Sequence, residues 1–184
     1  MMKQVTVYCA SSNAVDTRYL DVADAAGRLL VESGFTLVYG GGQVGLMGVI
    51  ARAVHGHGGR VFGVIPEALM EREGVAYEVA DELIVTKTMQ ERKAILFTRA
   101  DAFMVLPGGF GTLEEFMEVL TLKQLRYHDK PLTLVNTDGY YDPLLQLFEH
   151  FFEEGFAAER YRNLYFVAST PEEAIDYIRE NVGT

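Results

Sequence analysis

The chain has 184 residues, of which 49% are hydrophobic, and a formal net charge of −10. This length and composition predict a single folded domain, residues 1–184, with a full core, and they exclude global disorder. The acidic balance argues against nucleic acid or an anionic membrane surface as a partner, although local N–H groups could still hold a small phosphate ligand.

Strand-like and helix-like segments alternate along the chain. Short apolar runs predict strands at residues 5–9, 35–39, 60–65, 82–85, 102–106, 131–136 and 165–168. Capping signals and helical apolar spacing predict helices from Asp16 or Thr17 to about 34, then from after Gly42 to about 54, at 88–99, from 112 to about 127, at 140–152, and after Thr170. Residues 66–76 fit either a short helix or a loop. This alternation predicts an α/β fold: a doubly wound, mostly parallel sheet of about seven strands with helices on both faces.

Cysteine content and hydropathy bear on the compartment. Cys9 is alone, so no intrachain disulfide can form and a cysteine metal site is not expected. The first residues lead into a strand without the apolar core of a signal peptide, and no apolar run reaches membrane-spanning length. We therefore expect a cytoplasmic protein with no membrane partner.

Residues 107–115 (PGGFGTLEE) join an apolar strand to a helix. Gly108, Gly109 and Gly111 would let the backbone approach a ligand closely. The start of the helix offers free N–H groups and a partial positive charge, which suits a phosphate. The helix then carries Glu115 near its first turn. A phosphate cradle beside a carboxylate indicates chemistry on a phosphorylated substrate.

The same segment has a second interpretation. Thr112 and Glu115 have capping-box spacing, in which Glu115 would only accept a hydrogen bond from a backbone N–H. Taken alone, the pattern favours this cap. The upstream pair Arg92 and Lys93 favours a functional site instead, because cations near a helix N-terminus gain nothing from its dipole. The alternative is that Arg92 and Lys93 simply lie on a solvent-exposed face of their helix.

A second glycine-rich loop, residues 40–45, follows the second predicted strand and matches G-x-G-x-x-G. A dinucleotide fingerprint belongs to the first strand–helix turn, so an NAD-dependent oxidoreductase would rest on this loop alone. The loop is either a tight packing turn or part of the ligand site, contributing Gly41, Gly42 and Gly45. Ser12, after the first strand, could bind phosphate or simply enter a helix. No His, Asp and Glu spacing indicates a metal site, and we expect neither metal nor cofactor.

Three segments carry a family resemblance. Residues 107–115 match the pattern P-G-G-x-G-T-x-x-E, residues 89–94 (MQERKA) are similar to M-H-x-R-K-A, and residues 40–48 (GGGQVGLMG) to G-G-G-x-x-G-L-M-G. Together they resemble the LOG family of cytokinin-activating phosphoribohydrolases over nearly the whole chain. Gln90 stands where the family usually has His, and Ala10 where it often has Gly. These proteins have also been called lysine decarboxylases, but no pyridoxal-phosphate lysine context occurs here.

The resemblance implies a Rossmann-like fold and a homodimer or higher homo-oligomer with its site partly at the subunit contact. It implies hydrolysis of the N-glycosidic bond of a nucleoside 5′-monophosphate, such as AMP or N6-prenyl-AMP, with Arg92 and Glu115 catalytic and no cofactor. A non-catalytic nucleotide or molybdenum-cofactor carrier of the same fold is the alternative, and it would not need both of these residues. The expected substrate-binding residues are Ser12, Gly41, Gly42, Gly45, Glu73, Met89, Lys93, Gly108, Gly109, Phe110, Gly111, Thr112 and Thr121.

Overall fold

The computed structural model describes residues 2–73 and 76–183, with the backbone alone for residues 71–73. Within these residues it has a seven-stranded sheet in which every neighbouring pair of strands is parallel. The strands are β1 (Gln4–Tyr8), β2 (Thr36–Tyr39), β3 (Val61–Pro66), β4 (Glu82–Thr86), β5 (Ala102–Val105), β6 (Leu132–Val135) and β7 (Phe166–Ala168). The predicted strands are confirmed, with ends shifted by at most one residue.

Helices connect the strands. They are α1 (Thr17–Glu32), α2 (Gly45–Gly56), α3 (Glu67–Glu73), α4 (Met89–Arg99), α5 (Phe110–Gln124), α6 (Asp142–Glu153) and α7 (Pro171–Asn181), with 3-10 turns η1 (Thr137–Gly139) and η2 (Glu159–Leu164). The segment that fitted either a helix or a loop forms the short helix α3. The predicted start of α5 at Thr112 is wrong, since the helix begins two residues earlier.

Side-chain caps explain where three helices start. The Asp16 carboxylate accepts from the N–H of Arg18, and α1 follows. Thr88 and Thr170 cap α4 and α7 in the same way, through the N–H groups of Glu91 and Glu173. Each cap satisfies an N–H that has no partner within the helix. The caps expected from the sequence at Asp16 and Thr170 are confirmed.

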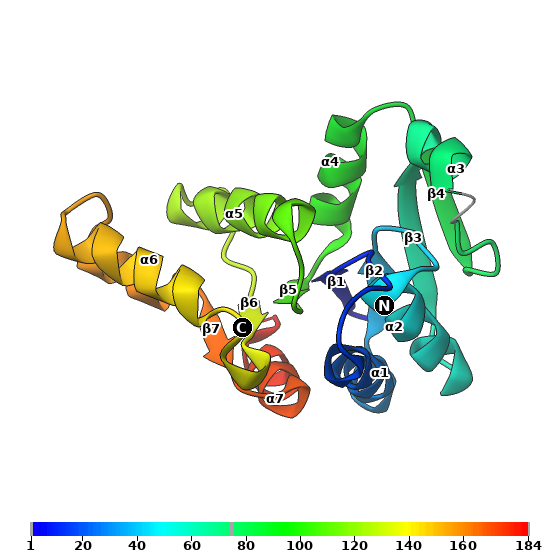
Figure 1. The fold of residues 1–184 in the computed structure, drawn as a ribbon, viewed down its shortest axis with the longest axis horizontal. Coiled ribbons are helices and arrows are strands. Elements are labelled where there is room, and N and C mark those ends of the chain that lie inside the picture. The colour runs from blue at the N-terminus through cyan, green and yellow to red at the C-terminus, as the bar shows by residue number, and fades with distance from the viewer. Residues whose placement is uncertain (1, 74–75, 184) are drawn as a thin grey trace.

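The helices cover both faces of the sheet, as predicted (Figure 1). One buried cluster combines the sheet with α1, α2 and α7, and includes Leu37, Ile50 and Ile178. The other combines the opposite face with α4, α5 and α6, and includes Phe103 and Phe116. Strands buried on both faces are apolar almost throughout, which is the pattern in the sequence.

The strand order β4-β3-β2-β1-β5-β6-β7 places a switch point between β1 and β5. The chain moves outward from β1 to β4, returns through α4, and continues on the other side of β1 with β5. The loops after β1 and β5 therefore leave the same sheet edge in opposite directions, which is where ligands of such sheets bind. None of the described helices has the length and apolar character needed to cross a membrane.

Candidate active site

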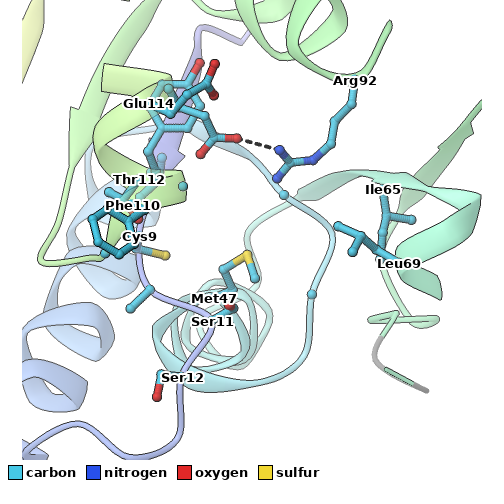
Figure 2. A pocket seen from close by; sticks show the side chains of 18 of the residues that line it. Cys9, Ser11, Ser12, Met47, Ile65, Leu69, Arg92, Phe110, Thr112 and Glu114 are labelled. Carbon is cyan, nitrogen blue, oxygen red and sulfur yellow. Dashed lines mark hydrogen bonds and ion pairs between the residues drawn. The ribbon is translucent and has the colours of Figure 1, made fainter. Parts of the chain in front are cut away.

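A cavity of about 340 Å³ opens at this switch point (Figure 2). Its walls come from the loop after β1, the glycine loop after β2, the first turn of α4, and the turn between β5 and α5. The residues from these segments that line it include Cys9, Ala10, Ser11, Ser12, Gly40, Gly42, Met47, Met89, Arg92, Gly109, Phe110, Gly111, Thr112, Glu114 and Glu115. Segments far apart in the sequence thus meet in one place.

Arg92 and Glu115 form a buried ion pair on the cavity wall. Nη1 of Arg92 lies 2.5 Å from Oε1 of Glu115, the contact marked by the dashed line in Figure 2. The two residues are only 7% and 9% exposed. Nε of Arg92 also donates to the carbonyl of Val64, at 3.1 Å. These two contacts hold the guanidinium between β3 and α5.

Gly40 makes room for this guanidinium. A Cβ at position 40 would lie 2.3 Å from Nη2 of Arg92, closer than nonbonded atoms approach. Any side chain there would displace the group that pairs with Glu115. Gly40 belongs to the glycine loop recognised in the sequence, but this role could not be inferred because Arg92 lies 52 positions away, in α4.

Burial sets the acidity of the carboxyl group. Removal from water raises the pKa of Glu115 above its usual value, while Arg92 opposes that shift by attraction and by hydrogen bonding. Burial also raises the pKa of Tyr8 and of Cys9, which line the same cavity and are therefore neutral near pH 7. The cavity lining thus combines the buried Arg92–Glu115 pair with the neutral Tyr8 and Cys9, and the side chain of Glu114 also lines it.

The N-terminus of α5 points its free N–H groups at the cavity. Its N-cap is Gly109, and no side chain caps it. Phe110, Gly111 and Thr112 form the first turn and line the cavity. The capping-box interpretation is therefore wrong: Thr112 lies inside the helix, and Glu115 pairs with Arg92 instead. The uncapped turn remains available to an anion.

Neighbouring side chains hold this turn in place. A Cβ on Gly108 would lie 2.1 Å from Oγ1 of Thr112, so only glycine fits there. The hydroxyl of Tyr140 donates to the carbonyl of Gly108, at 2.8 Å, and Tyr141 donates to that of Leu106, also at 2.8 Å. The sequence alone assigned no role to this tyrosine pair. The signal that could have found it is the run 138–141 (DGYY), which also resembles the family pattern.

The glycine loop after β2 packs closely rather than offering a dinucleotide fingerprint. Gly41 has φ +77° and lies against β3, and Gly42 lines the cavity beside Met47. Gly45 begins α2 with φ +58°, and its N–H donates to Oδ1 of Asn13, at 2.8 Å. This contact joins the loops after β1 and β2. Asn13 was not predicted from the sequence.

Several expected substrate-binding residues lie away from the cavity of one chain. Lys93 follows Arg92 in α4 but points along α5, where its amine pairs with Glu114 at 2.5 Å and Glu118 at 3.4 Å. Thr121 is exposed two turns further along α5. Glu73 ends α3, and its side chain lies outside the described part of the structure. Of the others, Ser12, Met89 and the 95%-exposed Phe110 line the cavity.

Metal ligands are not gathered at this site. Among the residues that the structure describes, no group of three or more His, Cys, Asp and Glu side chains is arranged to hold a metal ion. The cavity instead suits an organic anion, because it offers the N–H donors at the start of α5 together with a guanidinium that is paired with a carboxylate.

Known sequences resemble this chain closely. A family model described as "Possible lysine decarboxylase" matches residues 47–178. The cytokinin riboside 5′-monophosphate phosphoribohydrolase LOG of Oryza sativa subsp. japonica is 46% identical over 98% of this chain and 74% of its own length. The corresponding enzyme LOG3 of Arabidopsis thaliana is 43% identical over 97% of this chain and 82% of its own. The chain belongs to the LOG family. The described lining of the cavity contains no lysine, so a lysine Schiff base has no support there.

Solved structures share the fold at lower identity. A molybdenum cofactor binding protein from the phototrophic bacterium Rippkaea orientalis superposes with a TM-score of 0.75, at 24% identity and with 98% and 97% of the two chains covered. The molybdenum cofactor carrier protein of Chlamydomonas reinhardtii gives 0.74, at 20% identity and with 98% of each chain covered. These similarities establish the Rossmann-like fold of this LOG-family chain.

Proposed function

We propose that this protein hydrolyses the N-glycosidic bond of adenosine 5′-monophosphates, including N6-prenylated ones, releasing the free base and ribose 5-phosphate. The observation that carries the proposal is the buried Arg92–Glu115 pair, which lines the same cavity as the uncapped N-terminus of α5. Relatives that are 43% to 46% identical over nearly the whole chain bear the name of this activity.

The 5′-phosphate binds the N–H groups at the start of α5. Gly109, Gly111 and Thr112 present backbone there, and the helix dipole favours the negative charge. This contact lies away from the bond that breaks, so it fixes the orientation of the ribose without entering the reaction. A nucleoside without phosphate is therefore expected to be a poor substrate.

Glu115 stabilises the reacting sugar. Positive charge builds up on the ribose as the base leaves, and the fixed, buried carboxylate of Glu115 attracts it. The same carboxylate orients the water that adds to C1′. Arg92 holds Glu115 at 2.5 Å and contributes a permanent cation beside the substrate. In this reaction the C1′–N bond breaks, water supplies OH to C1′, and the base leaves with a proton.

The test is hydrolysis of AMP, N6-isopentenyl-AMP and the matching nucleoside by the purified chain, with free base and ribose 5-phosphate quantified. Glu115→Gln is expected to fold and to lose at least about a hundredfold in kcat, the scale of a lost electrostatic contact. Glu153→Gln is the control, because Glu153 is an exposed carboxylate at the end of α6, outside the cavity. Wild-type turnover in Glu115→Gln contradicts the mechanism, and binding without turnover in the wild type favours a carrier.

We also propose that two copies pair across α4 and α5. Lys93 and Thr121, both expected to bind substrate, lie outside the cavity of one chain but beside a shallow groove between these helices, lined in part by Phe97 and Leu122. A second copy bound in this groove would place Thr121 of the first copy near the cavity of the second copy.

We also propose a cytoplasmic location. The single cysteine, Cys9, is buried and free, as expected for a compartment in which disulfides do not form.

Light scattering during gel filtration measures the oligomer directly, and complementation tests the shared site. Glu115→Gln and Thr121→Arg are each expected to be inactive alone. Co-expressed in one cell, they form mixed dimers in which one of the two sites has both native residues, so part of the activity returns. A monomer in solution, or a mixture with no more activity than its parts, contradicts the pairing.

A further inference from the structure

A second cavity, of about 770 Å³, lies at the far end of α5. It is formed by the last turn of α5, the loop that follows, and η2, and we call it the α5–η2 cavity. With 15 residues, α5 is about 22 Å long, and the candidate active site lies at its other end. The two cavities share no lining residue.

Cations gather around the α5–η2 cavity in an otherwise acidic protein. Lys123, Arg126 and Arg160 line it. Within the described residues, none of the three belongs to an ion pair, whereas cations elsewhere such as Arg99 and Arg162 do. The exposed Asp129 also lines the cavity, so three cations face one carboxylate. The imbalance leaves a surplus positive charge in a chain whose net charge is −10.

The donors of these cations are largely free. The amine of Lys123 donates to the carbonyl of Lys130, at 2.8 Å, which uses one of its three hydrogens. The guanidinium of Arg160 contacts the neighbouring Tyr161, through its hydroxyl at 3.0 Å and its ring. Partial burial lowers the pKa of Lys123, because its charge has lost water and the attraction of Asp129 offsets that loss only in part. A bound anion would supply the missing partner.

The backbone at Arg126 supports a ligand role. Arg126 has φ +65° just after the end of α5, in the left-handed region where glycine is the usual residue. A long side chain held there at a cost in backbone energy indicates a purpose for its charge. The negative end of the α5 dipole attracts Lys123 and Arg126, but Arg160 comes from a different element, η2.

We propose that the α5–η2 cavity is a second ligand site, which binds a compact polyanion of the pyrophosphate type. Guanidinium groups grip phosphate oxygens through paired N–H donors, and an ammonium adds a point charge. The exposed Leu125, together with Leu164, gives the cavity an apolar wall. That wall would accept an organic group attached to the anion, such as a nucleoside.

The ring of His128 provides a local reporter. It lines the cavity, its Nε2 contacts the carbonyl of Val119 at 2.9 Å, and its Nδ1 accepts from the N–H of Lys130 at 3.2 Å. The experiment titrates the full-length protein with sodium pyrophosphate and follows the histidine ring signals by NMR. Sodium chloride at matched ionic strength controls for screening. Saturable shifts of the His128 signals, with those of His57 unchanged, are expected.

Variants decide whether these cations hold the anion. Arg126→Gly keeps the backbone conformation while removing the charge, and Arg160→Gln keeps most of the side chain. Each is expected to weaken binding about tenfold, as for one charged hydrogen bond. Arg179→Gln, on α7, is the control and should bind like the wild type.

ADP serves as a second probe. If ADP binds more tightly than pyrophosphate, the apolar wall contacts a nucleoside; if the two bind equally, the site recognises the anion alone. Shifts that do not saturate, or that persist in the variant carrying both Arg126→Gly and Arg160→Gln, overturn the proposal.

Discussion

Glu115 is a carboxylate that the fold buries beside a guanidinium and an open cavity. Burial raises the pKa of Glu115, whereas its partner Arg92 lowers it. Burial dominates, so the pKa of Glu115 lies above that of a free glutamate, about 4.3. The ionised form, which the proposed mechanism needs, is therefore lost at a higher pH than for an exposed carboxylate. By linkage, the same shift makes ionised Glu115 a cost to folding stability that disappears as the pH falls through its folded pKa.

This shift predicts the acidic limb of the pH–rate profile. As the pH falls, kcat is expected to decline through an apparent pKa above about 4.3, because protonated Glu115 no longer attracts the charged sugar. The measurement is kcat against pH at saturating N6-isopentenyl-AMP, which reports the enzyme–substrate complex. Glu153→Gln, on the exposed end of α6, should leave the limb unmoved. A profile that stays flat down to pH 4 would remove Glu115 from the reaction.

At the scale of elements, the site depends on a contact between the loop after β2 and the first turn of α4. Gly40 and Arg92 meet there only because α4 crosses back over β1, β2 and β3 on its way to β5. The loop supplies no charged group of its own. It controls the site by leaving space for a guanidinium.

Gly40→Ala should therefore impair catalysis while the protein stays folded. The added methyl group would meet Nη2 of Arg92 at 2.3 Å, so the guanidinium must move away from Glu115. We expect at least about a tenfold loss of kcat, since small misplacement of catalytic groups costs this much or more. Gly56→Ala is the matched control, because nothing lies within 4 Å of a Cβ there. Steady-state kinetics with circular dichroism separates the two variants, and equal activity would refute the steric argument.

Across the whole molecule, α5 connects core, active site and the α5–η2 cavity. Phe116 is fully buried among the rings of Phe148 and Tyr165, whereas Phe110, on the same helix, is 95% exposed at the cavity rim. One residue type thus serves packing at one position and ligand contact at the other, because the two positions lie on different sides of the helix.

Alanine substitution should separate these roles. Phe116→Ala is expected to lower the free energy of unfolding by about 3–5 kcal/mol, through lost burial and the cavity left behind. Phe110→Ala should change stability by less than about 0.5 kcal/mol, the range of surface substitutions, while raising KM. Urea unfolding and steady-state kinetics provide the two readouts. A destabilised Phe110→Ala, or a stable Phe116→Ala, would contradict the assignment of faces.

The sequence by itself determined the order of strands and helices, since apolar spacing and capping side chains act over a few residues. Asp16 and Thr170 start their helices as predicted, and the family motifs marked Arg92 and Glu115. The tertiary structure decided what these residues do. The spacing of Thr112 and Glu115 suits a cap as well as a buried pair, and only the approach of α4 to α5 selects the pair. Gly40, Asn13 and Tyr140 gained their roles in the same way, because their partners are distant in sequence and meet only at the switch point of the folded sheet.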